Sequence, residues 1–267
     1  MLARLAVFLL LLFSASFPAV AEVLDCLVVP RQTADLAFGT SGVVERLLVD
    51  RGDHVRKGDE LAFLDSSVEA ASLAIAEARL AEVASIELAR AQMAAAQSKL
   101  RRSQALESKQ IMSTSKFEET EVEHESARLK VIEQEEMQRL KVLDVQRVKA
   151  ALGLRRIVSP FDGFVVERHV APGEYVENRK VLTVAQIDPV YADVIAPASL
   201  FSDVKKGQKV RVTLQQPANR VVVAETAVVD PYVDAASGTF RARLAIANPD
   251  HAIVPGFRCR AEVSPGD

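Results

Sequence analysis

The sequence predicts a multidomain protein of β and α structure: a β-sandwich split by a long antiparallel α-helical hairpin, followed by a small antiparallel β-barrel. Three observations lead to this prediction. One stretch of 87 residues contains none of the 11 glycines and none of the 11 prolines. A β-type pattern occurs twice, once on each side of that stretch. The chain then continues as short β-type runs separated by turn residues.

The stretch without glycine or proline extends over residues 66–152. Glycine and proline cost roughly 1 and 3 kcal/mol inside a helix, so their absence predicts uninterrupted helix. Ser115 and Glu118 form a capping box after the weakly helical run 112–115, which favours two antiparallel helices over one. Each arm of roughly 40 residues would reach on the order of 60 Å. We therefore expect an α-helical coiled-coil hairpin over 66–152.

Sparse apolar residues follow each arm and predict a narrow helix-on-helix seam. They are Leu73, Leu80, Val83, Val122, Leu129, Ile132, Leu140 and Leu143. Glu135 and Arg139 are spaced for an i,i+4 ion pair on a solvated face. On these residues alone the hairpin is either a solvated spacer or a spacer whose tip docks on a partner.

Residues 1–21 have the pattern of a targeting segment, with Arg4, a short apolar run and the A-x-A sequence at 19–21. The apolar run is too short to span about 30 Å of hydrocarbon, which favours a cleaved signal peptide over a retained anchor. A lipid anchor at Cys26 is disfavoured, because Asp25 precedes it where a small residue is required. We therefore expect an exported protein.

Composition and residue placement argue against several functions. The net charge of −3 gives no reason to expect nucleic acid, and the absence of Trp disfavours a stacking platform for bases or sugars. No catalytic constellation is apparent, so we predict no enzyme, no metal site and no cofactor. The four histidines are scattered and are expected in surface or turn positions: His54, His124, His169 and His251.

An internal repeat flanks the hairpin. A shift of 121 residues superposes 42–65 on 163–185 and matches six positions. The matched pairs are Gly42 and Gly163, Val44 and Val165, Val49 and Val170, Gly52 and Gly173, Val55 and Val176, and Leu61 and Leu182. Each copy predicts a strand, a glycine turn and a second strand. Two such halves facing each other make a small flattened sandwich.

These halves resemble those of a biotinyl/lipoyl-type domain. The second is preceded by Ile157-Val158-Ser159-Pro160-Phe161-Asp162-Gly163, which resembles the (I/V)-x-(A/S)-P-F-D-G entry of periplasmic adaptor proteins, also called membrane fusion proteins. The resemblance implies lipoyl-like halves at 39–65 and 153–188. A carrier domain places a modified lysine on the turn between its halves. Here the hairpin occupies that place, so a biotinyl- or lipoyl-carrying subunit is disfavoured.

Beyond residue 188 the pattern is β-type without helix. The predicted strands are Tyr191–Ile195, Lys209–Leu214, Val221–Val229, Phe240–Ile246 and Phe257–Val263. Lys206-Gly207-Gln208 and Ser237-Gly238-Thr239 resemble turns of the adaptor family's barrel, expected at 189–267. The segment 22–38 is expected to join this barrel.

The resemblance also assigns a role to the hairpin tip. Adaptors that dock onto a TolC-type outer-membrane channel commonly carry Arg, then Leu four residues on, then Ser seven further. Arg102, Leu106 and Ser113 have this spacing. A guanidinium offers several donors to carbonyl or carboxylate oxygens, Leu fills a groove, and the Ser hydroxyl bonds locally. The resemblance therefore implies channel contact at these three residues.

The implied function is a periplasmic adaptor of a tripartite efflux or export system, most similar to the RND type. It would join an inner-membrane transporter, of RND or ABC type, to a TolC-type channel, as a ring that is commonly hexameric. It would be held at the inner membrane through that transporter. An envelope scaffold without a transport role is the alternative. Two departures are Arg179 where the first repeat has Gly58, and the lack of a domain beyond the barrel, which leaves the mode of pump docking open.

Cys26 and Cys259 are the only cysteines. In the proposed architecture both lie in strands of the same barrel, and an oxidising compartment permits a disulfide. A bonded pair and two buried thiols are the alternatives.

Overall fold

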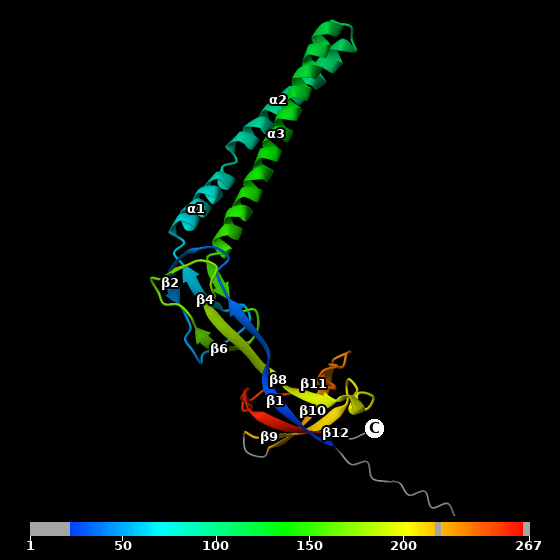
Figure 1. Ribbon diagram of the computed structural model, residues 1–267. Helices are drawn as coiled ribbons and strands as arrows, with labels where there is room; N and C mark the ends of the chain where they lie inside the picture. Colours follow the sequence, from blue (N-terminus) through cyan, green and yellow to red (C-terminus); the bar gives the residue numbers. More distant parts are fainter. Residues whose placement is uncertain (1–21, 217–219, 264–267) are drawn as a thin grey trace, which may run out of the picture. The chain divides into compact units, whose positions relative to one another are not determined.

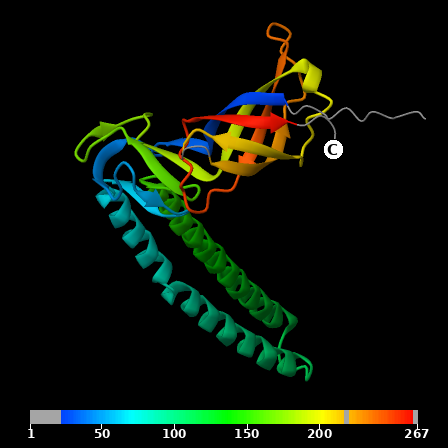
Figure 2. The same ribbon diagram turned by 90° about the horizontal axis from the view of Figure 1, so that it is seen from below.

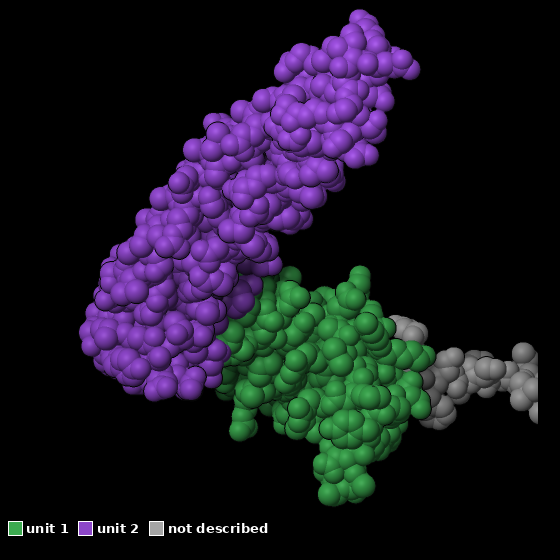
Figure 3. Space-filling view, turned by 90° about the horizontal axis from the view of Figure 1, so that it is seen from above, with its two compact units in different colours: residues 1–34, 161–166, 184–267 green, residues 35–160, 167–183 purple. Residues whose placement is uncertain are grey.

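The computed structural model describes residues 22–216 and 220–263 (Figure 1). The predicted targeting segment 1–21 lies outside the described residues. The chain divides into two compact units (Figure 3). Unit 1 comprises residues up to 34, 161–166 and those from 184 onward, and unit 2 comprises 35–160 and 167–183. The chain forms a β-barrel, whose strands lie mainly in unit 1, and a β-sandwich with a helical hairpin, most of whose residues lie in unit 2, so the predicted fold class is confirmed.

Six strands form the barrel in the order β1-β12-β9-β10-β11-β8, and β1 also pairs with β8, which closes it. Their bounds are β1 Glu22–Leu36, β8 Leu182–Pro197, β9 Lys209–Leu214, β10 Val221–Val229, β11 Thr239–Ile246 and β12 Arg258–Val263. A short 3-10 helix, η1 (Ala198–Leu200), follows β8. Buried residues alternate with outward ones along β9, β11 and β12, as expected for strands with one face in a core. The N-terminal segment contributes β1, whose residues 22–27 pair with β12.

The sandwich is built from the two repeat copies. Its strands are β2 Gly42–Leu47, β3 His54–Val55, β4 Glu60–Leu64, β5 Arg156–Val158, β6 Gly163–Arg168 and β7 Tyr175–Val176, together with the start of β8. The shift of 121 residues carries β2 onto β6 and β3 onto β7. Strand β2 of the first copy pairs with β7 of the second, with Gly42 opposite Val176. Each copy therefore completes its pairing with a strand of the other.

Side chains that recur in the repeat fill the sandwich core. Val44, Val165, Leu61 and Leu182 are each at most 1% exposed. A Cβ added to Gly163 would lie 2.4 Å from the carbonyl oxygen of Ala185, so this position requires glycine. At the matched position, a Cβ added to Gly42 would lie 3.0 Å from an Arg155 guanidinium nitrogen, so this site is tight but does not exclude a side chain in the way that Gly163 does.

The repeated turns are held alike, with one difference. The Asp53 carboxylate accepts the backbone N–H of Asp50, and the Glu174 carboxylate accepts that of Ala171, at equivalent positions. Gly58 has φ +90°, whereas in the second copy Asn178, with φ +46°, takes the left-handed conformation. The expected difference at Arg179 is therefore a shift of the left-handed residue by one position.

The hairpin consists of α1 (Ser67–Ala81) and α2 (Ala84–Glu107) in one arm and α3 (Thr114–Gly153) in the other (Figures 1 and 2). The second arm is continuous, as predicted, and is about 60 Å long. The first arm breaks at residues 82–83, although no glycine or proline is present. The expectation of uninterrupted helix was wrong at this point.

The break follows from a one-residue shift of the arm's inward face. In α2 the buried residues recur every seven positions, at Ala89, Ala96 and Ser103. In α1 the inward residues, Leu73, Ala76 and Leu80, have heptad spacing. If the helix continued unbroken, the same spacing would turn Arg90 inward, whereas Ala89 is the residue that is buried. One residue turns a helical face by about 100°. Glu82 takes an extended conformation (ψ 99°), which absorbs this difference.

Two side chains of α3 bind the carbonyl groups that the break leaves free. The Gln138 amide donates to the Leu80 carbonyl (2.8 Å), and the Lys141 ammonium donates to the Glu82 carbonyl (3.1 Å). Helix-end carbonyls need such partners when no intrahelical donor is available. The break is therefore a hydrogen-bonded part of the hairpin.

The predicted seam was wrong on α3. Leu73 and Leu80 pack against Ala76, Val145 and Val148, as a seam requires. The five predicted α3 residues and Val83 instead face solvent, at 41–65% exposure. Small and β-branched residues form the seam and let the helices approach closely, so the larger aliphatic residues lie on the opposite side.

Two local predictions also change. The side chain that caps α3 is Ser113, which accepts the N–H of Lys116, rather than Ser115. Glu135 pairs with Arg90 of the other arm, and Arg139 pairs with Glu136. Within the described residues, no helix is long and apolar enough to cross a membrane.

Candidate docking site at the hairpin tip

The α2–α3 turn brings the three predicted tip residues to the end of the hairpin. Gln110 has φ +60°, and its N–H donates to the Glu107 carbonyl (2.8 Å). The N–H of Ile111 donates to the Leu106 carbonyl (3.0 Å). Together these bonds form a Schellman motif, in which the residues at the positions of Leu106 and Ile111 commonly make an apolar contact. The helix end is thus fixed by backbone bonds although it lacks glycine.

The three side chains have different surroundings. Ser113 is bonded locally as the cap of α3. Leu106 is 39% exposed and Ile111 is 69% exposed, so the turn presents apolar side chains to solvent. Arg102 is exposed and forms no ion pair within the described residues. The tip therefore offers a free guanidinium and an apolar pair on a fixed turn. The sequence did not indicate Ile111, because its place at the tip depends on the left-handed Gln110.

Beneath the tip the seam is polar. Ser103 of α2 and Thr120 of α3 are buried, with their hydroxyl oxygens 3.5 Å apart. The Nε2 atom of His124 is buried without a hydrogen-bond partner in the described part of the chain. The expectation of a surface position for His124 was therefore wrong. Polar seam positions fix the register of paired helices at some cost in stability.

The two arms carry opposite charge near the tip. Residues 98–109 of the first arm have a net charge of +3, and residues 114–125 of the second have −4. Lys99 forms an ion pair with Glu123 across the seam. A hydrogen bond from Lys116 lowers the pKa of Glu119 below its usual value. Arg101 and Arg102 have no acidic partner within the described residues, so the positive charge of the first arm is left exposed near the tip.

At its base the hairpin is tied to the sandwich. The Leu64 N–H donates to the Arg155 carbonyl (2.8 Å), which brings the two chain ends of the hairpin together. The Arg155 guanidinium donates to the Asp65 carbonyl (2.9 Å) and to a Glu69 carboxylate oxygen (2.6 Å). The backbone N–H of Ser67 lowers the pKa of the Asp65 carboxyl. These bonds hold both helices where they leave the β-sheet.

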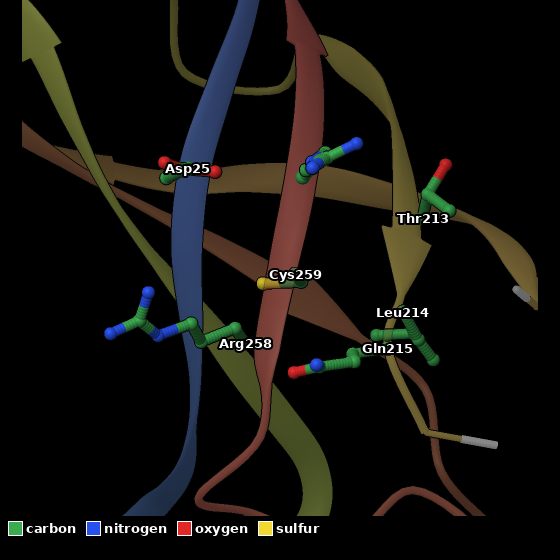
Figure 4. Close-up of a pocket in the computed structure, with 7 residues that line it drawn as sticks. Asp25, Thr213, Leu214, Gln215, Arg258 and Cys259 are labelled. Atoms are coloured by element: carbon green, nitrogen blue, oxygen red, sulfur yellow. The ribbon is translucent and has the colours of Figure 1, made fainter. Parts of the chain in front are cut away.

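The two cysteines meet in the barrel. Cys26 is opposite Cys259 in the β1–β12 ladder, with Cα atoms 4.8 Å and sulfur atoms 2.16 Å apart. Figure 4 shows the Cys259 sulfur directed toward β1, beside a pocket of about 400 Å³ that Asp25 and Arg258 also line. The pocket is open at the surface of the barrel.

Other polar groups serve structure. The Thr183 hydroxyl donates to an Asp35 carboxylate oxygen (2.6 Å), and His169 Nε2 lies 2.9 Å from the same hydroxyl. His169 is thus a partly buried member of a network rather than a free surface residue. Among the residues with described positions, no three His, Cys, Asp or Glu side chains are grouped to hold a metal ion.

A sandwich divided by a helical hairpin and followed by a small barrel is the architecture of membrane fusion proteins, the adaptors of efflux systems. The chain belongs to the CzcB-like family: the CzcB-like barrel-sandwich hybrid domain matches residues 32–186, and the CusB-like β-barrel domain matches residues 189–266. These matches define an RND-type adaptor protein.

Individual relatives are distant. The chain is 24% identical over 240 residues to an uncharacterized protein of Haemophilus influenzae, covering 89% of this chain and 56% of that protein. It is 26% identical over 244 residues to the cobalt-zinc-cadmium resistance protein CzcB of Cupriavidus metallidurans, covering 88% and 43%. The chain therefore spans about half the length of these curated relatives.

The fold is also similar to that of a solved structure. The crystal structure of MacA from Actinobacillus actinomycetemcomitans superposes with a TM-score of 0.76 at 23% identity. The match covers 92% of this chain and 79% of that one. At this identity the likeness establishes the fold.

Proposed function

We propose that this protein is a periplasmic adaptor that joins an inner-membrane transporter to a TolC-type outer-membrane channel for efflux. The observation that carries the proposal is the hairpin tip, where Arg102 lacks an acidic partner and Leu106 faces solvent on a turn fixed by hydrogen bonds. A desolvated guanidinium bonded to a partner contributes more than an exposed ion pair, and the contact is repeated in a ring of copies.

The proposed arrangement extends to location and assembly. The protein would lie in the periplasm after removal of residues 1–21, without a lipid anchor. It would be held at the inner membrane by a transporter of RND or ABC type. Copies would form a ring, commonly of six, and Cys26 and Cys259 would be disulfide-bonded. Its role would be non-enzymatic and without a cofactor. Relatives include the cobalt-zinc-cadmium resistance protein CzcB and the multidrug efflux pump subunit AcrA of Escherichia coli, so both cargo classes enter the test.

Tip substitutions test the docking role. We expect Arg102→Asp and Leu106→Asp each to abolish tolerance of the cargo that the wild-type gene restores to a deletion strain. Secretion and thermal unfolding should stay at wild-type values, because neither side chain supports the core. Gln104→Asp is the matched control, since it adds one charge at an exposed position two residues from Leu106.

The deletion strain is challenged with zinc, cobalt, cadmium, drugs and solvents. Full tolerance with both tip variants would remove the docking role. If deletion of the gene leaves tolerance of every compound unchanged, an envelope scaffold without a transport role is favoured instead. Crosslinking in cells followed by purification of the tagged protein identifies the transporter and the channel.

A further inference from the structure

The polar seam beneath the tip contains a histidine that the docking surface does not use. The Nε2 atom of His124 is buried, and no residue with a described position forms a hydrogen bond with it. Buried polar atoms are nearly always hydrogen-bonded, so this exception needs a physical explanation. The neighbouring hydroxyls are engaged elsewhere: Thr120 donates to the Lys116 carbonyl (3.0 Å), and its oxygen lies 3.5 Å from that of Ser103. The ring therefore lies in the seam with one nitrogen unpartnered.

The unpartnered nitrogen makes the seam sensitive to the charge of the ring. A neutral imidazole carries one N–H and leaves the other nitrogen bare, whereas an imidazolium carries an N–H on both nitrogens. A buried charged donor that lacks an acceptor loses its hydration and gains no hydrogen bond. Histidine is the side chain that changes charge between about pH 5 and 8. The neutral ring therefore fits this position, and the protonated ring does not.

We propose that His124 is a pH-sensitive positioning residue for the docking tip: the seam beneath Arg102 and Leu106 is closed while the ring is neutral and opens when the ring is protonated. The proposal rests on the docking role above and adds how that role is regulated. Ser103 follows Arg102 in sequence and is buried in the same layer as Thr120. Leu106 lies one helical turn beyond Arg102. Opening of this layer therefore moves both docking side chains relative to α3.

The charged groups around the ring decide where it goes when it is protonated. Those at about its height on the hairpin are Lys99, Arg101 and Arg102 of α2 and Glu121, Glu123, Glu125 and Arg128 of α3. Two of the carboxylates are paired, Glu123 with Lys99 across the seam and Glu125 with Arg128. Glu121 forms no ion pair within the described part of the chain. All three lie on the exposed surface of α3, so a protonated ring is drawn out of the seam toward acidic side chains.

A role in helix register alone is the alternative. Polar seam positions specify which residues of two paired helices face each other. Ser103 and Thr120 already form such a layer without an ionisable group. A register role would not depend on pH, whereas the proposed role is lost as the pH falls through the range in which His124 becomes charged. The pH dependence of the tip therefore separates the two roles.

Amide hydrogen exchange on the purified full chain measures the opening, because protection reports local unfolding. Protection factors, which remove the pH dependence of chemical exchange, are compared at about pH 8 and about pH 5, the ends of the histidine range. Protection of residues 98–108 and 116–126 should fall severalfold at the lower pH. Residues 86–93, farther from the tip, should keep their protection. NMR titration of the His124 ring protons, identified by their loss in His124→Leu, shows where the ring becomes charged.

Three variants test whether the histidine is the cause. His124→Leu keeps a side chain in the seam that cannot become charged, so its tip protection should be equal at both pH values. His54→Gln, at an exposed position of the sandwich, is the matched control and should respond as the wild type does. Thr120→Asp places a carboxylate one turn from the ring, where it accepts the missing hydrogen bond. In this variant protection should rise on acidification.

Three results would overturn the proposal. They are wild-type tip protection that is equal at both pH values, a His124→Leu tip that opens as the wild type does, and a loss of protection that Thr120→Asp leaves unchanged. If His124→Leu does not fold, the comparison of the wild type with Thr120→Asp decides.

These outcomes concern the purified protein and are independent of efflux. In the deletion strain, the ratio of cargo tolerance at about pH 8 to that at about pH 5 should be severalfold larger for the wild-type gene than for His124→Leu. Equal ratios would remove the effect on docking. If the tip opens on acidification but Arg102→Asp and Leu106→Asp keep full tolerance, the docking role fails and the opening stands. If those tip variants abolish tolerance but protection does not depend on pH, the docking role stands and the opening fails.

Discussion

The barrel and the hairpin use apolar residues in opposite ways. In the barrel, Val212, Leu214 and Leu244 are enclosed by strands, at most 1% exposed. In the hairpin the buried positions of α2 are small or polar, Ala89, Ala96 and Ser103, while the larger Leu129 and Leu140 of α3 face solvent. The β part thus buries its large aliphatic side chains, whereas the hairpin leaves its own exposed to solvent, where they can contact a partner.

This difference separates stability from recognition. Burial of apolar surface is the main source of folding free energy, so the β strands should supply most of it. A hairpin seam of mostly small and β-branched residues, with a polar layer near the tip, contributes less per residue. The hairpin can therefore present Arg102, Leu106 and the exposed aliphatic residues of α3 to partners without endangering the fold. The predictions below test this division, from the largest expected effect to the smallest.

The cysteine pair should have the largest effect on stability. Replacing Cys26 and Cys259 together by Ala removes a link between positions 233 apart. In the chain-entropy model a loop of that length stabilises by up to about 5 kcal/mol. Urea denaturation of the two proteins measures the loss. Thiol titration of the unfolded, unreduced wild type should find no free thiol, and two per chain would contradict the bond.

A matched pair of leucine truncations tests the comparison directly. Leu182→Ala in the sandwich should lower the free energy of unfolding by about 2–5 kcal/mol, because it leaves a cavity in a closed core. Leu129→Ala, on the solvent-exposed side of α3, should change the free energy of unfolding by less than about 0.5 kcal/mol in the isolated chain. Urea denaturation at low protein concentration compares them. Equal losses would show that Leu129 belongs to the hairpin's own core.

The break in the first arm gives a smaller effect. Gln138→Ala removes the donor to the Leu80 carbonyl and should cost about 0.5–1.5 kcal/mol. The loss should be local, so amide hydrogen exchange near Glu82 is the measurement. Gln146→Ala, at an exposed position of the same helix, is the control. Exchange that is unchanged by Gln138→Ala would mean that the bond does not hold the break.

The smallest effect is on pH dependence. The hydrogen bond from Thr183 is the main cause that lowers the pKa of Asp35 below its usual value of 3.8. The associated stability is present above that value and is lost as the pH falls through the lower, folded-state pKa. Thr183→Val should raise the pKa of Asp35, and NMR titration of its carboxyl measures the change. An unshifted titration would assign the lowering to Lys180 instead.

The sequence was most informative where a residue type has one structural use. The repeat positions of Gly42, Val44 and Leu61 predicted the sandwich, since each has a counterpart in a shared core or close approach. The run free of glycine and proline predicted the hairpin, because both residue types destabilise the interior of a helix. Four of the five predicted barrel strands, β9 to β12, begin within one residue of the predicted start, whereas β8 begins earlier, at Leu182.

The sequence was less informative where side chains have several possible partners. The spacing of Leu129, Leu140 and Leu143 fits an outer surface as well as a seam, and the choice depends on what faces α3. The break at Glu82 arises from two incompatible heptad phases, which become visible only when α3 fixes the inward direction. The tip spacing located Arg102, Leu106 and Ser113, but Ile111 depends on a left-handed Gln110 that no glycine signals.

Deletion of the hairpin tests the central claim most directly. Residues 66–152 are removed and replaced by a short turn, which is feasible because Leu64 and Arg155 are hydrogen-bonded to each other at the base. The protein should remain soluble, show a β-type circular dichroism spectrum and unfold in a cooperative transition, while it restores no efflux to the deletion strain. A protein without cooperative unfolding would contradict the division of stability and recognition between the β part and the hairpin.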